Sequence, residues 1–153
     1  MILFVFITSN TVINIYPFIN NDYNNYLFNI SKTVKKDDVV LANLNSDFYF
    51  NNSKLHDYRN LAFLKENNMN FKDYIYKYNI KYIIYPEEMD VIYNESPKWD
   101  ALYGNLSYYN EMKSFLENNC TLVNEFNNKT YGIRISRYIN EKDWFVKIYK
   151  VKY

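Results

Sequence analysis

The clearest pattern of secondary structure in the sequence runs from Asn70 to Pro86 and reads NFKDYIYKYNIKYIIYP. Its first half places apolar side chains at the i, i+3, i+4 and i+7 spacing of one helical face: Phe71, Tyr74, Ile75 and Tyr78. Its second half, residues 82–85, is a continuous β-branched and aromatic run that Pro86 ends, which is typical of a buried strand. A helix that leads into a buried strand is half of a βαβ unit, so the fold needs a second, parallel strand.

Residues 38–43, DVVLAN, supply that second strand. An amphipathic helix is expected before it over residues 22–36, with Asp22 as its N-cap. Another helix is expected over residues 106–119, where apolar side chains again share one face. The chain therefore alternates helices with strands, which predicts an α/β fold.

The C-terminal part predicts a β-hairpin from residues 120–126 and 130–138, and then a last strand over residues 144–151. Cys120, at the start of the hairpin, is expected to be a small buried residue. The resulting fold is a three-layer α/β sandwich with a small mixed sheet. Parallel strands lie at its centre and the antiparallel hairpin at one edge, in a Rossmann-like arrangement.

Three segments carry weaker patterns. Residues 48–50 predict a short strand or a loop, and residues 56–68 a weak helix. The core contacts expected from that helix are Leu61, Phe63 and Leu64. Residues 87–104 contain Pro97 and Trp99 and are expected to form a long irregular loop, a kind of segment that is usually functional or ordered by its own aromatic side chains.

Length and composition bound the possible functions. The chain has 153 residues, enough for one domain with a real core, and a net charge of +1, which argues against a nucleic-acid binder. Its 2 glycines form no phosphate-binding loop. A single cysteine and a single histidine provide neither a disulfide nor a metal cluster, so no metal and no cofactor are expected. The 18 tyrosines suit stacking on sugars, but they also follow from a compositional bias of the genome.

Residues 1–18, MILFVFITSNTVINIYPF, form an apolar segment that ends in a polar stretch. Three interpretations remain open: the end of a transmembrane helix, an uncleaved signal anchor, or a first core element. The first is favoured, with Pro17 marking the point where the chain leaves the bilayer. The expected organisation is therefore a membrane segment at 1–18 and a single extracytoplasmic α/β domain at 19–153.

Acceptor sequences for N-glycosylation support this location. The pattern Asn-x-Ser/Thr begins at six positions: Asn29, Asn51, Asn94, Asn105, Asn119 and Asn128. In a chain this rich in asparagine the excess is suggestive. It favours exposure outside the cytoplasm.

Ligands of open parallel sheets bind beyond the carboxyl ends of the strands. The residues that follow the two predicted strands are amides and carboxylates: Asn43, Asn45, Asp47, Glu87, Glu88 and Asp90. Their oxygens suit a sugar or a divalent cation, although such residues also make ordinary solvated turns. Trp99 is a further candidate, because its ring could stack on a glycan, lie at a membrane interface, or hold the loop to the core.

His56 and Asp57 are adjacent and could act as a general base and its orienting carboxylate. Neighbouring residues rarely face each other, however, and no motif places a serine or cysteine nucleophile beside them. A surface histidine and an ion-pairing or packing Arg59 are the better interpretation.

Together these segments resemble a known family. The apolar start, DVVLAN (38–43), YRNLAFL (58–64), FKDYIYKYNIKYIIYP (71–86) and FLENNCTLVNEFNNKTYGIRISRY (115–138) look like the extracytoplasmic C-terminal domain of polytopic lipid-sugar-dependent glycosyltransferases. This is the C-superfamily that includes the dolichyl-phosphate-mannose protein mannosyltransferases. The resemblance runs from about Ile15 onward and contains no invariant signature.

In that family the catalytic aspartate lies between transmembrane helices, so the resemblance assigns no catalytic residue to this chain. It implies a non-catalytic accessory domain on the outer membrane face that helps to place a glycan or protein acceptor or to stabilise the enzyme. The alternative is a stand-alone module that binds a small ligand, such as a sugar or nucleotide, through the strand-end residues. A small hydrolase or transferase built around His56 is a third hypothesis.

Overall fold

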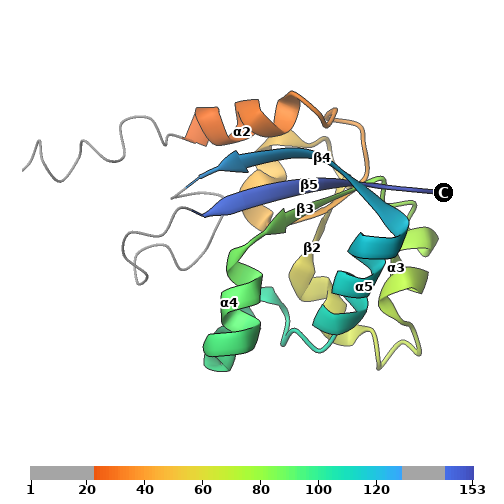
Figure 1. Ribbon diagram of the computed structural model, residues 1–153. Coiled ribbons are helices and arrows are strands. Elements are labelled where there is room, and N and C mark those ends of the chain that lie inside the picture. Colours follow the sequence, from red (N-terminus) through yellow and green to blue (C-terminus); the bar gives the residue numbers. More distant parts are fainter. Residues whose placement is uncertain (1–22, 129–143) are drawn as a thin grey trace, which may run out of the picture.

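The computed structural model describes residues 23–128 and 144–153 and has an α/β fold. Within these residues, five strands form one mixed sheet in the order β2-β1-β3-β5-β4 (Figure 1). The strands are β1 (Val40–Ala42), β2 (Leu55–Asp57), β3 (Tyr82–Pro86), β4 (Cys120–Asn127) and β5 (Phe145–Val151). β1 is parallel to both β2 and β3, and β5 is antiparallel to both β3 and β4. The predicted parallel pair of β1 and β3 is confirmed.

Residues 70–86 fold into a helix and a strand as predicted, because the helix cap, the turn and the buried strand each suit the local sequence. Helix α3 (Phe71–Lys77) begins with a capping box, in which the Asn70 side chain accepts a hydrogen bond from the Asp73 backbone at 2.9 Å. The chain reverses at Asn79, which has a left-handed φ of 51°. It then enters β3, whose five residues are all buried. The position of Asn79 suits this turn, since asparagine tolerates the left-handed region better than most residues.

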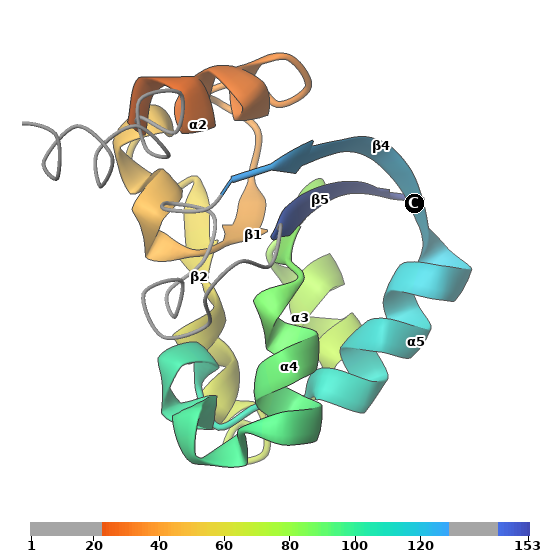
Figure 2. The same cartoon turned by 60° about the vertical axis from the view of Figure 1, so that its left-hand side comes forward.

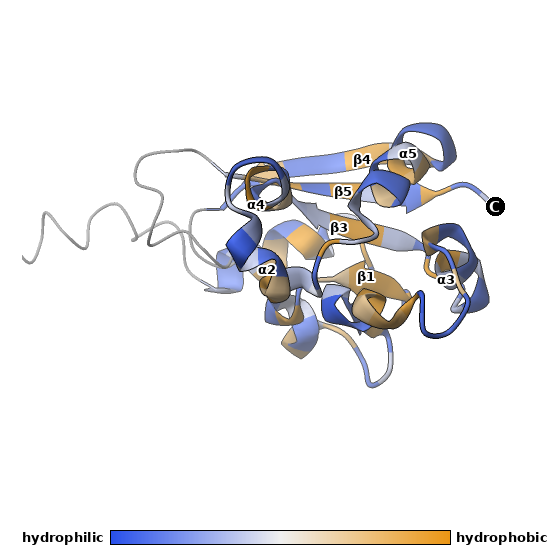
Figure 3. Cartoon of the chain, turned by 90° about the horizontal axis from the view of Figure 1, so that it is seen from below, coloured by the Kyte–Doolittle hydropathy of each residue, from blue (hydrophilic) through white to orange (hydrophobic). Residues whose placement is uncertain are grey.

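Helices cover both faces of the sheet. α2 (Tyr23–Ser31) lies on one face, and α3 and α5 (Tyr109–Asn119) lie on the other (Figure 1). Side chains alternate along the central strands, so that Leu41 and Ile83 contribute to one core cluster while Val40 and Ile84 contribute to the other. Figure 3 shows the hydrophobic residues of β1 and β3 at the centre of the fold.

The prediction of a long irregular loop over residues 87–104 is wrong. The segment forms α4 (Glu88–Glu95) and the 3₁₀ helix η4 (Pro97–Tyr103). Acidic residues in the first turn favour α4, and proline in the first turn favours η4. The sequence shows no clear helical period here because α4 buries only two apolar side chains, Met89 and Ile92.

The weak helix predicted over residues 56–68 is also wrong. Its start belongs to strand β2, and only η3 (Tyr58–Phe63), a 3₁₀ helix, follows. Leu61 and Leu64 are buried as expected, but Phe63 is 55% exposed and is not a core residue. A strand of three residues is too short to show a period of its own.

Residues 48–50, predicted as a strand or loop, lie mainly in the 3₁₀ helix η2 (Leu44–Tyr49). Cys120 is buried at the start of β4, as predicted. The second hairpin strand (130–138), the Asp22 cap and the apolar segment 1–18 all lie outside the described residues. Among the residues that the structure describes, no helix combines the length and apolarity needed to cross a membrane.

Candidate functional site

The carboxyl ends of the parallel strands meet at one edge of the sheet, as the topology predicts. Asn43 follows β1, while Glu87 and Glu88 follow β3 at the point where α4 begins. Asn43 is 2% exposed and Glu88 is 0% exposed, so these two predicted site residues are buried rather than solvated. Burial of a carboxylate is costly unless hydrogen bonds compensate it.

Tyr103 joins these two residues. Its hydroxyl donates a hydrogen bond to Glu88 Oε1, and Asn43 Nδ2 donates to the same hydroxyl at 3.4 Å. Tyr103 is fully buried and lies at the end of η4, far along the chain from the ends of β1 and β3. No local pattern singles it out, because the contact depends on η4 folding back over the sheet.

Asp57, at the end of β2, connects this strand to the segment that follows β1. Its Oδ2 accepts a hydrogen bond from the Leu44 backbone at 3.1 Å, and its Oδ1 accepts from Arg59 N and Nε, each at 2.8 Å. Asp57 is the last residue of β2, so the strand-end rule would have selected it if β2 had been recognised. Asn43, Asp57, Glu88 and Tyr103 are called the carboxyl-edge network below.

Chemically, the carboxyl-edge network ties together the segments that leave β1, β2 and β3. Each of its polar side chains holds another segment of the same chain. The network therefore fixes the loops at the edge where ligands of related folds bind.

Glu87 and Trp99 lie outside this network. Glu87 Oε2 accepts a hydrogen bond from the Phe145 backbone at 3.3 Å and so joins α4 to β5. Trp99 is partly buried and packs against the core cluster on the α3 and α5 face. The structure thus favours the interpretation in which Trp99 holds its segment to the core.

Asp90 belongs to a separate cluster between α4 and α5. Its Oδ1 accepts hydrogen bonds from the Tyr85 hydroxyl at 2.6 Å, from Lys113 Nζ at 3.1 Å and from the Tyr109 hydroxyl. Partial burial opposes the charge of Asp90, but these hydrogen bonds and the Lys113 charge together lower its pKa below the ordinary value of 3.8. The cluster links the two helices.

We expect the substitution Asp90→Asn to lower the free energy of unfolding by about 1–2 kcal/mol at pH 7, since it removes a charged hydrogen-bond acceptor. A lowered pKa in the folded state means that this stability is present above pH 3.8 and is lost as the pH falls through the folded-state pKa. Urea unfolding at pH 7 and pH 3 measures the difference, with exposed Glu66→Gln as the control. If the difference in free energy of unfolding between wild type and Asp90→Asn were as large at pH 3 as at pH 7, the stabilising role of the Asp90 charge would be contradicted.

Asn45 and Asp47 line a surface hollow with a volume of about 460 Å³. This aromatic hollow is formed by Tyr23, Leu44, Asn45, Asp47 and Phe48. The Tyr23 hydroxyl donates a hydrogen bond to the Asn45 carbonyl at 2.9 Å, and its ring meets the Phe48 ring edge to face at 6.4 Å. These two predicted site residues therefore face a cavity that is open to solvent.

His56 lies in a second hollow of about 370 Å³, whose other walls are Asn60, Phe63, Asn67, Tyr74 and Tyr78. His56 Nδ1 forms a hydrogen bond of 2.9 Å with the Tyr74 hydroxyl, and burial lowers the pKa of the imidazole. Asp57 instead forms an ion pair with Arg59, with 2.8 Å between Oδ1 and Nε. The geometry thus supports an ion-pairing Arg59 rather than a catalytic pair.

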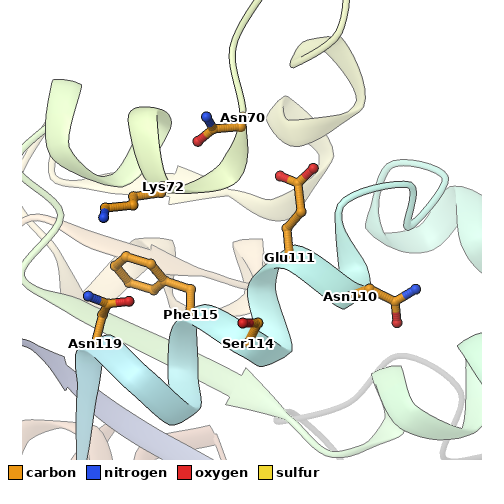
Figure 4. A pocket seen from close by; sticks show the side chains of 7 residues that line it. All are labelled: Asn70, Lys72, Asn110, Glu111, Ser114, Phe115 and Asn119. Carbon is orange, nitrogen blue, oxygen red and sulfur yellow. The ribbon is translucent and has the colours of Figure 1, made fainter.

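A third hollow, of about 610 Å³, lies between α3 and α5 (Figure 4). Figure 4 shows Glu111 extending from α5 toward the start of α3 near Asn70. Glu111 Oε2 accepts a hydrogen bond from the Phe71 backbone at 3.0 Å. This carboxylate therefore caps α3 and holds the two helices together.

The described residues contain no group of three or more His, Cys, Asp or Glu side chains placed to hold a metal ion. The fold and the site together define an α/β domain with a mixed sheet, a buried polar edge and a separate aromatic hollow. Comparison with protein-family models, curated proteins and solved structures gives no match to this chain. Its function must therefore be argued from the residues.

Proposed function

We propose that this chain is a non-catalytic accessory domain of a membrane glycosyltransferase, held at the extracytoplasmic face by the apolar segment 1–18. The domain would help to place a glycan or protein acceptor or to stabilise the enzyme. We also propose that its α/β fold has the three-layer, Rossmann-like arrangement. Core clusters on both faces of the sheet support that arrangement.

The observation that carries the proposal is the carboxyl-edge network. In catalytic α/β domains, the polar side chains at this edge face the substrate. Here Asn43 and Glu88 both bond to Tyr103, and Asp57 bonds to backbone and side-chain donors of neighbouring segments. Side chains committed in this way suit a rigid scaffold better than a reaction centre.

Two acceptor asparagines support an extracytoplasmic location. Asn51 lies in the exposed turn before β2, and Asn105 is exposed after η4. Neither side chain belongs to the core, although the Asn51 amide nitrogen donates an exposed hydrogen bond to Asp37 Oδ1 at 2.6 Å. Both positions are therefore compatible with the modification that the sequence pattern predicts.

The experiment is expression of the full chain in a eukaryotic cell, followed by alkaline carbonate extraction and endoglycosidase treatment. We expect the chain to stay in the membrane fraction and to carry glycans on Asn51 and Asn105, so that each single Asn→Gln substitution removes one mobility shift. Asn52→Gln is the matched control, because Asn52 adjoins Asn51 but starts no acceptor sequence. An unglycosylated chain in the soluble fraction would overturn the proposal.

The second candidate is a stand-alone module for a sugar or nucleotide. The aromatic hollow favours it, because Tyr23 and Phe48 offer rings for stacking while Asn45 and Asp47 offer hydrogen-bond partners. Thermal-shift measurements of the full chain with soluble sugars, nucleotides and divalent ions separate the two candidates, since a ligand that binds only the folded state raises the melting temperature.

A further inference from the structure

We propose that the rim of the aromatic hollow inserts into the headgroup region of the bilayer and sets the orientation of the domain on the membrane. Phe48 is the inserting residue, with Leu44 and Tyr23 beside it. The inference rests on the proposed function, because it requires the apolar segment 1–18 to lie in the membrane. It adds the surface of the domain that meets the lipid.

Phe48 is the most exposed large apolar side chain among the residues that the structure describes. Phe48 is 90% exposed and Leu44 is 44% exposed, both on η2. Other large apolar side chains, such as Phe28 and Phe63, are also exposed, but Phe48 lies together with Leu44 and Tyr23 around one hollow. Contiguous exposed apolar residues mark contacts with a partner or a membrane. Tyrosine collects at membrane interfaces, and phenylalanine and leucine form the buried face of segments that lie in the interface.

The exposed ring belongs to a fixed segment. The Tyr26 hydroxyl and Ser46 Oγ form a hydrogen bond of 2.8 Å between α2 and η2, and the Tyr49 hydroxyl donates to the Val34 carbonyl at 2.8 Å. Phe50, two residues after Phe48, is buried. Phe48 is therefore held outward by anchored neighbours, which keeps it available to an external partner.

Chain length limits how far this surface can lie from the membrane. Four residues lie between Phe18, the end of the apolar segment, and Tyr23, the first residue of α2, which makes five steps from one Cα to the next. A fully extended chain of this length spans at most about 18 Å. The Phe48 ring lies 6.4 Å from the Tyr23 ring, so it is close to the start of α2. Figure 2 shows α2, the element that follows the apolar segment, at one edge of the fold. A lipid surface is thus the partner that the chain itself brings to the hollow.

Charge near the rim gives a further expectation. Lys36 lies 5.9 Å from the centre of the Tyr49 ring, while Asp47 lies in the hollow itself. The exposed carboxylate of Asp47 lies in the hollow beside Phe48 and would repel anionic headgroups, so acidic lipid does not favour this contact. Insertion of Phe48 should therefore occur in zwitterionic phosphatidylcholine membranes without acidic lipid.

The test uses the full chain in phosphatidylcholine vesicles, with Phe48→Cys labelled by an environment-sensitive fluorophore. Cys120 is buried and its thiol pKa is raised to about 12, so labelling at neutral pH is directed to the introduced cysteine. Phe63→Cys is the matched control, because Phe63 is also exposed but lines the separate His56 hollow. We expect the label at position 48 to shift to shorter wavelength and to lose at least half its emission to nitroxide-labelled lipid, with neither change at position 63.

Each other outcome overturns the inference. If the chain binds vesicles but the labels at positions 48 and 63 respond alike, Phe48 does not insert into the membrane. The proposed function would still stand. If the chain does not float with the vesicles, both the insertion of Phe48 and the proposed function are refuted. A label at position 48 that responds to soluble oligosaccharide but not to vesicles identifies the hollow as a glycan site instead.

Discussion

Replacement of Glu88 by alanine is expected to lower the free energy of unfolding by about 3 kcal/mol. The substitution removes the acceptor of the Tyr103 hydroxyl at a position with 0% exposure, so it costs a buried hydrogen bond and also leaves a cavity. Glu88→Gln keeps the volume and one acceptor oxygen, and we expect roughly half the loss. Urea unfolding at pH 7 measures both variants.

The matched control for Glu88 is Glu95→Ala at the other end of the same helix. Glu95 is exposed, and exposed substitutions usually change stability by less than about 0.5 kcal/mol. Equal effects of the two alanine variants would mean that the carboxyl-edge network does not hold the loops together. The proposed scaffold role would then lose its main support.

The fold was predictable where local signals agree with tertiary packing. Residues 70–86 carry a capping box, a 3.6-residue period and a buried β-branched run, and each signal acts within a few residues. The parallel pairing of β1 with β3 follows from that segment because a helix between two strands permits few connections. These features could be predicted without any knowledge of distant contacts.

The carboxyl-edge network was only half predictable, for a physical reason. Asn43 and Glu88 follow recognisable strands, but the hydroxyl that joins them belongs to Tyr103. Tyr103 reaches Glu88 across 15 residues of chain, through a 3₁₀ helix without a sequence period of its own. Asp57 was missed as a strand-end residue because β2 spans only three residues. Contacts that depend on short irregular helices leave little trace in a local pattern.

The substitution Gly104→Ala is expected to lower the free energy of unfolding by about 2–5 kcal/mol. Gly104 has a left-handed φ of 74°, which costs an alanine roughly 1–2 kcal/mol. An added Cβ would also lie 2.9 Å from Arg59 Cα and 3.0 Å from the Arg59 carbonyl oxygen. Backbone atoms cannot rotate away as a side chain can, so η3 and η4 would have to separate, and overpacking of this kind adds about 1–3 kcal/mol.

Gly104→Asn separates the two causes, because asparagine tolerates a left-handed φ but brings the same Cβ toward Arg59. We expect its loss of stability to stay above about 1 kcal/mol in urea unfolding. Asn105→Gly is the control, since Asn105 is also left-handed but exposed. Glycine relieves the left-handed strain but removes the hydrogen bond from Ser107 N to Asn105 Oδ1, so the free energy of unfolding should change by less than about 1 kcal/mol. Gly104 directly follows Tyr103, so its close approach to Arg59 should help to hold Tyr103 in place. If Gly104→Asn were as stable as wild type, this close approach would not hold Tyr103. The position of Tyr103 next to Glu88 would then depend on the hydrogen bonds of the carboxyl-edge network.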